Sequence, residues 1–144
     1  MKSSLVFLTK EFYEDHSEPS FREIEHKVER PYIVLLVKIE DKVWGLPFRS
    51  HIRHEHAFWT DKPNRCGIDY SKAVMITDQK YIDKSLTPHL RQNEFEAIRG
   101  QEFNIYKGFL SYINKYRKAK KSGHPRYRNL LEFSTLQNYP ELFE

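Results

Sequence analysis

A continuous apolar run in the first third of the chain constrains the fold more than any other feature. Tyr32–Glu40 contains the five consecutive apolar residues IVLLV, and such a run is typical of a strand that is covered on both faces. Two acidic residues can turn the chain, and Lys42–Phe48 then returns as the second arm of a hairpin. Gly45 and Pro47 interrupt this second arm, which predicts a bulge or an edge position for it.

Further strands are predicted on either side of this hairpin. Short runs with β-branched and aromatic residues predict strands over Ser4–Thr9 and Gly67–Thr77. Lys10–Glu29 is polar and acidic, and we expect a loop there with a helical turn around Phe21–His26. Trp59–Gly67, which is marked by proline, asparagine and glycine, predicts a second loop.

The C-terminal half of the chain has helical periodicity. Asn93, with a glutamate three residues later, is a candidate capping box, and apolar residues then recur at mostly helical spacing. Gly100 is expected to divide this region into two helices, and Gly123 to end the second of them. The tail, Tyr127–Phe143, fits a strand or a loop and is expected to finish with a short helix after Ser134.

Size and composition favour one intracellular domain over residues 1–144. A chain of 144 residues is long enough for one core and short for two. The single cysteine, Cys66, excludes an internal disulfide and is typical of a reducing compartment, which predicts a cytoplasmic location. No run approaches the roughly 20 apolar residues of a membrane span, so no membrane partner is expected.

The predicted hairpin leads directly into an unusual density of cationic and titratable side chains. The ten positions 49–58 hold two arginines, three histidines and one serine: Arg49, Ser50, His51, Arg53, His54 and His56. Histidine changes its charge near neutral pH, and the guanidinium of arginine matches phosphate oxygens. These residues therefore favour an anionic, phosphate-bearing substrate.

Several kinds of chemistry could use these residues. The histidines could be metal ligands, although the usual third and fourth ligands are not evident, and we expect no metal and no cofactor. Ser50 lacks the flanking glycines of a nucleophile elbow, while a Ser–His–Asp triad stays open because its members need not be close in sequence. Cys66 has only a neighbouring arginine in its favour as a nucleophile.

Metal-free cleavage of RNA needs no nucleophile from the protein, because the ribose 2′-OH attacks the adjacent phosphate. The protein must orient this attack, move two protons and neutralise charge on the phosphate oxygens. Charge could come from Arg49, Arg53 and Lys72, proton transfer from His51 or His54, and a hydrogen bond to the phosphate or the 2′-OH from Ser50.

A basic block follows near the end of the predicted second helix. It contains seven cations and no acid: Lys115, Arg117, Lys118, Lys120, Lys121, Arg126 and Arg128. Such a block on a chain with a net charge of only +4 indicates a polyanionic partner or, equally, a solvated helix end.

Four segments taken together carry a resemblance to a known family. The strand RPYIVLLVKI, the segment GLPFRSHIRHEHAF, the strand GIDYSKAVMI and the later long helix with its basic end resemble the toxins of type III toxin–antitoxin systems. Within that family, the ToxN/AbiQ group, the chain is most similar to the TenpN branch, over most of residues 4–120. The resemblance implies an α+β fold with a compact, strongly twisted antiparallel sheet, a partial barrel similar to the MazF/Kid toxins, and attached helices.

The resemblance also implies a function. Members of this family are metal-independent endoribonucleases that leave 2′,3′-cyclic phosphate ends and cut both cellular RNA and their own repeat-containing antitoxin RNA. The processed RNA folds as a pseudoknot, binds the toxin in a closed head-to-tail assembly and inhibits it. Many of these systems abort phage infection, so cellular or phage RNA would be the substrate.

Site residues carry over only in part. The family has a Thr-Ser pair followed by lysines, where this chain has Arg49, Ser50 and then Arg53, while Lys72 matches a position typical of the TenpN branch. The expected RNA-binding residues combine the start of the central strand with the aromatic residues and cations of the last helix: Arg30, Tyr32, Tyr112, Lys115, Tyr116, Lys118, Lys120, Lys121, Arg126 and Arg128.

Two rivals to this interpretation remain from the sequence. A non-catalytic RNA-binding protein would use the same basic surface without cleaving RNA. A metal-dependent hydrolase would be built on the histidines.

Overall fold

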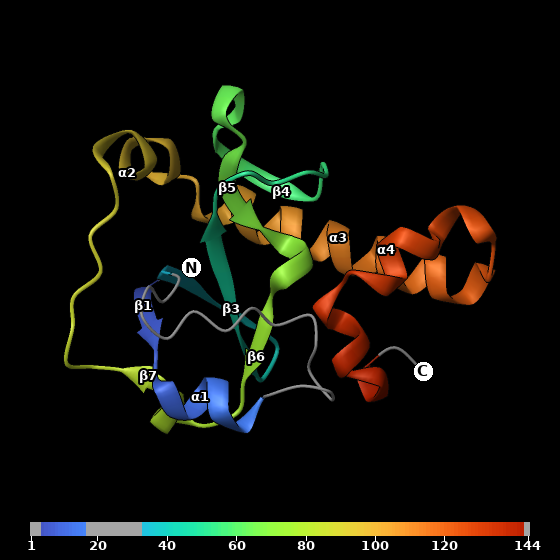
Figure 1. The fold of residues 1–144 in the computed structure, drawn as a ribbon, viewed down its shortest axis with the longest axis horizontal. Coiled ribbons are helices and arrows are strands. Elements are labelled where there is room, and N and C mark those ends of the chain that lie inside the picture. The colour runs from blue at the N-terminus through green and yellow to red at the C-terminus, as the bar shows by residue number, and fades with distance from the viewer. Residues whose placement is uncertain (1–3, 17–32, 143–144) are drawn as a thin grey trace.

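The computed structural model describes residues 4–16 and 33–142, which form an open, seven-stranded antiparallel sheet and four α-helices (Figure 1). The strands are β1 (Ser4–Leu8), β2 (Ile33–Ile39), β3 (Lys42–Arg49), β4 (Ala57–Asp61), β5 (Cys66–Asp69), β6 (Val74–Ile76) and β7 (Ile82–Asp83). The α-helices are α1 (Lys10–Asp15), α2 (Gln92–Ile98), α3 (Glu102–Ser122) and α4 (Arg128–Glu132). The predicted α+β class, with a twisted antiparallel sheet and attached helices, is confirmed, and the sheet is not closed.

The hairpin of β2 and β3 lies at the centre of this sheet, as the apolar run predicts. The two strands pair without interruption from Val34↔Pro47 to Ile39↔Lys42. Both faces of β2 are covered: Leu35 belongs to the main core beneath α3, and Val34 belongs to a second cluster with α1.

The predicted edge position or bulge for β3 was wrong, because β3 is a central strand with a regular register. On the side away from β2 it pairs with β6 at residues 43–45 and with β5 at Phe48 and Arg49. Counting along the ladder from the two-residue turn, Val34↔Pro47 is a non-hydrogen-bonded pair, so the nitrogen of Pro47 points away from β2. Proline has no backbone N–H to donate, but the nitrogen of Pro47 faces the gap between β5 and β6, where no strand pairs with it.

The single strand predicted over Gly67–Thr77 is divided into β5, a 3₁₀ turn and β6. The turn, Tyr70–Lys72, forms because the side chain of Asp69 accepts a hydrogen bond from the backbone N–H of Ser71. The loop predicted over Trp59–Gly67 is in part wrong, since β4 extends to Asp61. Gly67 allows β4 and β5 to approach, because a Cβ at this position would overlap the backbone of Phe58.

Both glycines predicted to punctuate the helical half do so. Gly100, with φ of +73°, separates α2 from α3, and Gly123, with φ of +65°, ends α3. The capping box at Asn93 was wrong: the N-cap residue is Arg91, whose side chain instead pairs with Glu94 one turn later.

Two further predictions concern the ends of the chain. The strand or loop expected after Tyr127 is the helix α4, and the short helix expected after Ser134 is a 3₁₀ helix that Ser134 caps. The loop predicted from Lys10 begins as α1, capped by Thr9. The helical turn predicted around Phe21–His26 lies outside the described residues.

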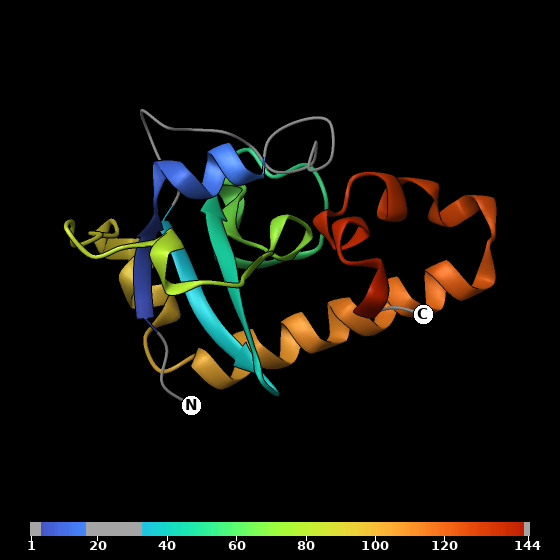
Figure 2. The same ribbon diagram turned by 90° about the horizontal axis from the view of Figure 1, so that it is seen from below.

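Helix α3 covers one face of the sheet and then extends past it. Phe109 is fully buried, with its ring centroid 5.4 Å from that of Trp44 on β3. The chain turns at Gly123 and returns beside the C-terminal half of α3 as α4 (Figure 2). Within residues 4–16 and 33–142, no helix is long and apolar enough to cross a membrane.

Gly108, in the middle of α3, provides a test of this packing. A Cβ at this position would overlap the hydroxyl of Tyr70, which donates a hydrogen bond to the carbonyl of Ile105. Helix propensity favours alanine over glycine by about 1 kcal/mol, but overpacking a core costs about 1–3 kcal/mol. We therefore expect Gly108→Ala to lower the free energy of unfolding by about 1 kcal/mol, measured by urea denaturation. Ser111→Ala, on an exposed position of the same helix, is the control, and a stabilised Gly108→Ala protein would contradict the packing.

Candidate active site

A cleft of about 610 Å³ lies where the end of β3 meets the C-terminal helices. The last residue of β3 and the segment that follows it contribute five of its lining residues: Arg49, His51, Arg53, His54 and His56. The turn after β5 contributes Ser71 and Lys72, and α3 contributes Tyr112. Helix α4 contributes Asn129 and Leu130, and its C-cap residue, Phe133, completes the lining. Five of the six residues in the cluster predicted from the sequence therefore line one wall of a cleft, and Ser50 does not.

The segment 50–56 has no regular secondary structure, and Arg65 holds it in place. The guanidinium of Arg65 donates hydrogen bonds of 2.8 Å to the carbonyls of Ile52 and His54 and lies 4.4 Å from the ring centroid of Trp59. The carbonyl of Arg65 accepts the N–H of Ile52 at 3.1 Å, and the Ile52 side chain is buried. A loop fixed by these bonds can present its histidines and arginines in defined positions.

Asp69 is the centre of the polar network in this wall. Its carboxylate is fully buried and accepts hydrogen bonds from Arg49 Nη1 at 2.6 Å and from the hydroxyl of Ser71 at 2.6 Å. The Nε2 atom of His54 lies 3.2 Å from one carboxylate oxygen and 3.1 Å from the other. Burial alone would raise the pKa of Asp69, but the hydrogen bonds from His54 and Ser71 and the charge of Arg49 outweigh it and lower the pKa below its ordinary value.

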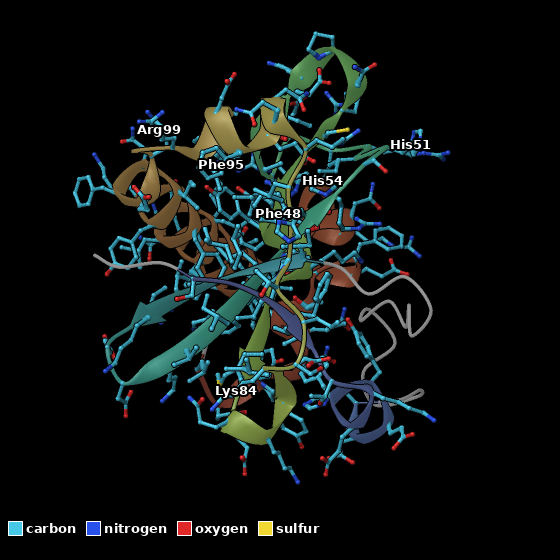
Figure 3. The ribbon with its side chains drawn as sticks, turned by 90° about the vertical axis from the view of Figure 1, so that its left-hand side faces the viewer. Phe48, His51, His54, Lys84, Phe95 and Arg99 are labelled. Carbon is cyan, nitrogen blue, oxygen red and sulfur yellow. The ribbon has the colours of Figure 1, made fainter. Side chains whose placement is uncertain are left out.

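The hydrogen bonds of His54 determine which of its nitrogens carries the proton. The backbone N–H of His56 donates to Nδ1 of His54 at 2.9 Å, so Nδ1 must be an acceptor. The proton of the neutral ring therefore resides on Nε2, from which it is donated towards Asp69. Figure 3 shows His54 lying inward near Phe48, with His51 at the outer margin of the molecule.

This geometry does not activate a serine nucleophile. In a Ser–His–Asp triad the aspartate binds one ring nitrogen and the serine gives its proton to the other. Here Ser71 and Asp69 meet the same nitrogen of His54, Nε2, and that atom already carries a proton. Ser71 is 6% exposed and donates its hydroxyl to Asp69, so it fixes the network.

His56 is the group in the cleft best suited to accept a proton. Its ring lies between those of His54 and Tyr112, with centroid separations of 5.4 Å and 5.3 Å. Burial lowers the pKa of His56 below its ordinary value of 6.5, and the positive charge of Lys115 lowers it further. His56 is therefore neutral at physiological pH, with a lone pair available on its ring.

The opposite wall, α4, is tied to the turn that carries Ser71. Lys72 donates from Nζ to the carbonyl of Phe133 at 3.0 Å, at the C-terminus of α4. The hydroxyl of Tyr112 donates to Ser134 Oγ at 2.6 Å, and Thr135 donates its hydroxyl to the carbonyl of Ala73. The two walls of the cleft are thus connected through buried hydrogen bonds.

Several other predicted site residues lie outside the cleft or are buried. Ser50 is exposed at the end of β3 and does not line the cleft. Tyr112 and Tyr116 are 2% and 3% exposed, so their rings offer little surface for a base to stack on. Arg30 and Tyr32 lie outside the described residues. The cations expected to bind RNA are exposed along the end of α3 and the segment after it: Lys115, Lys118, Lys120, Lys121, Arg126 and Arg128.

Sequence reasoning missed Asp69 and the residues of α4. The pattern Asp-x-Ser at Asp69–Ser71 is a turn signal that could have ended the predicted strand and placed a carboxylate beside the cations. Nothing in the tail sequence indicates that α4 returns to the cleft. As for a metal, no group of three His, Cys, Asp or Glu side chains in residues 4–16 and 33–142 is arranged to hold one.

The lowered pKa of Asp69 gives a prediction for stability. A depressed pKa in the folded state stabilises the fold at every pH above the unfolded value, near 3.8, and this contribution is lost as the pH falls below it. Asp69→Asn should therefore lower the free energy of unfolding by about 3 kcal/mol near neutral pH, because it leaves Arg49 without its buried partner. The difference from the wild type should narrow as the pH falls below about 4 and through the lowered pKa of the folded state.

Urea unfolding at several pH values would measure this difference. Asp41→Asn, which removes an exposed carboxylate paired with its neighbour Lys42, serves as the control and should follow the wild type. A constant gap between Asp69→Asn and the wild type across the acid range would show that Asp69 is not charged in the fold.

Comparison with known proteins adds nothing to this picture: the sequence matches no family model, and neither a curated protein nor a solved structure is significantly similar to it. The chemistry of the cleft therefore has to follow from its own residues.

Proposed function

We propose that this protein is a metal-independent endoribonuclease. The observation that carries the proposal is the cleft itself, in which two arginines and a neutral histidine converge on one space beside a buried carboxylate. In the proposed reaction the 2′-oxygen of a ribose attacks the adjacent phosphorus, and the bond from phosphorus to the 5′-oxygen breaks. The products are a 2′,3′-cyclic phosphate and a free 5′-hydroxyl.

Each step of this reaction has a suitable group in the cleft. His56 accepts the proton of the attacking 2′-hydroxyl, since its lowered pKa keeps it neutral. Arg53, which is exposed in the cleft, and Arg49, oriented by Asp69, neutralise the charge that develops on the phosphate oxygens. His51 gives a proton to the leaving 5′-oxygen. His54 acts as a positioning residue, because its Nε2–H is directed at Asp69.

The surface beside the cleft supports a polyanionic substrate. A shallow groove of about 490 Å³ runs along α3 and is lined by Lys107, Lys115 and Lys118. Because Lys115 also contributes positive potential at His56, the groove and the cleft belong to one electropositive region.

The toxin assignment rests on the resemblance to the ToxN/AbiQ group. We propose on that basis that the chain is the toxin of a type III toxin–antitoxin system. Its repeat-derived RNA pseudoknot would be both product and inhibitor, in a closed head-to-tail assembly that acts against phage. If inhibitor and substrate share one site, an RNA terminus should occupy the cleft.

Incubation of the purified protein with RNA in excess EDTA tests the nuclease. We expect cleavage products with 2′,3′-cyclic phosphate ends. RNA that is bound and left intact would support the non-catalytic rival, and cleavage that EDTA abolishes would support the metal-dependent hydrolase. Either result contradicts the proposal.

The pH dependence of cleavage tests the assignment of His56. Because the base must be neutral, activity should fall as the pH drops through its pKa, so the acid limb of kcat/KM should have its midpoint below about 6.5. His56→Gln should lower kcat by about 100-fold or more and remove that limb. His89→Gln, at an exposed histidine outside the cleft, is the matched control. An unchanged acid limb in His56→Gln would assign the base to another group.

A further inference from the structure

The wall of the cleft formed by α4 differs in chemistry from the wall formed by the segment after β3. Asn129, Leu130 and Phe133 line it, with one amide, one aliphatic chain and one aromatic ring and no charge. They are spaced so that one face of this short helix points into the cleft. The cleft therefore has a cationic side and an uncharged side with an aromatic ring.

Phe133 is exposed in an unusual way for a large apolar residue. Its side chain is 54% exposed, although its backbone and the residue that follows it are held by hydrogen bonds. The carbonyl of Phe133 accepts from Lys72, and the next residue, Ser134, is 1% exposed and bonded to Tyr112. These bonds limit the movement of the backbone that carries the ring, which lowers the entropy cost of binding a ligand against the ring.

A nucleotide has the two chemistries that the two walls require. Its phosphate is an anion, which suits Arg49 and Arg53, and its base is a flat, uncharged ring with donors and acceptors on its edge. An inorganic anion would use only the cationic wall, and an apolar ligand would use only the uncharged wall.

We propose that α4 forms a nucleobase subsite, in which Phe133 stacks on one unpaired base next to the scissile phosphate and Asn129 hydrogen-bonds to the edge of that base. This inference rests on the proposed function and names its substrate: single-stranded RNA whose base can be turned out of its stack. The ring of Phe133 takes the role that the buried Tyr112 and Tyr116 cannot fill. Bases inside a duplex are already stacked on both sides, so duplex RNA is excluded from the subsite.

Binding of uncleavable probes separates this subsite from the chemistry. The probe is a short single-stranded oligoribonucleotide with a 2′-deoxy substitution at its cleavage position, which removes the attacking hydroxyl. A second series carries one abasic position, moved along the probe. For the wild-type protein we expect removal of one particular base to weaken binding by about 10-fold, measured by fluorescence anisotropy at each of several salt concentrations.

Variants of Phe133 then test which residue reads that base. Phe133→Leu should weaken binding of the intact probe by about 10-fold and should abolish the abasic penalty, while Phe133→Trp should retain both. The triple variant Lys118→Ala, Lys120→Ala and Lys121→Ala is the matched control: it should flatten the salt dependence of binding but keep the abasic penalty. Asn129→Ala should change which base is preferred. Because the Phe133 ring is exposed, the melting temperatures of the Phe133 variants should stay close to that of the wild type.

An abasic penalty that persists in Phe133→Leu, or is absent from the wild type, overturns the subsite. Its failure is distinguishable from failure of the nuclease, because cleavage is measured separately on all-ribose RNA. Cleavage with no effect of Phe133 on binding would leave the nuclease standing without the subsite. If the abasic penalty depends on Phe133 but no RNA is cleaved, the subsite is supported and the protein is a non-catalytic RNA-binding protein.

Discussion

The candidate site depends on one buried carboxylate. Asp69 is fully buried, and a lone carboxylate in that position would carry a large desolvation cost. Three neighbours offset this cost: the guanidinium of Arg49, the ring of His54 and the hydroxyl of Ser71. These residues come from the end of β3, the segment after it and the turn after β5, so the carboxylate links the paired ends of β3 and β5 to a segment that has no regular secondary structure.

The sheet brings these parts within reach because β3 is shared by two short partners. Residues 43–45 pair with β6, and the last two residues of β3 pair with β5. This arrangement pairs Arg49, at the end of β3, with Gly67 on the neighbouring strand β5, two residues before Asp69. On the other side of the cleft, Thr135 and Ser134 bind to Ala73 and Tyr112, which fixes α4 without a place in the sheet. The cleft therefore lies between the segment that follows β3 and the C-terminal segment around α4.

Features that depend on local chemistry were predictable from the sequence. The β2–β3 hairpin follows from the IVLLV run, and the breaks at Gly100 and Gly123 follow from the freedom of glycine to adopt positive φ. The concentration of cations and histidines at the end of β3 and after it was also visible in the sequence. Six of the predicted site residues line the cleft: Arg49, His51, Arg53, His54, Lys72 and Tyr112.

Features that depend on contacts between distant residues were not predictable. Arg49 and Asp69 are 20 residues apart in sequence, and Lys72 and Phe133 are 61 residues apart. No local sequence pattern therefore predicts either hydrogen bond. Ser50 looked like the serine of the site because it lies among the cations, yet it is exposed outside the cleft, and the serine that enters the cleft is Ser71. Pro47 suggested an edge strand because proline cannot donate a backbone hydrogen bond. The sequence does not show that β5 and β6 leave a gap beside its nitrogen, which allows Pro47 to lie in a central strand.

The protonation of His54 tests this organisation most directly. The account requires Nδ1 to accept the backbone N–H of His56 and Nε2 to carry the proton that faces Asp69. Nitrogen-15 NMR of the imidazole rings distinguishes the two tautomers in solution at neutral pH. The account predicts that His54 is found in one tautomer, with hydrogen on Nε2 and none on Nδ1. A proton on Nδ1, or rapid averaging between the two nitrogens, would contradict the network around Asp69 and the roles assigned to the cleft.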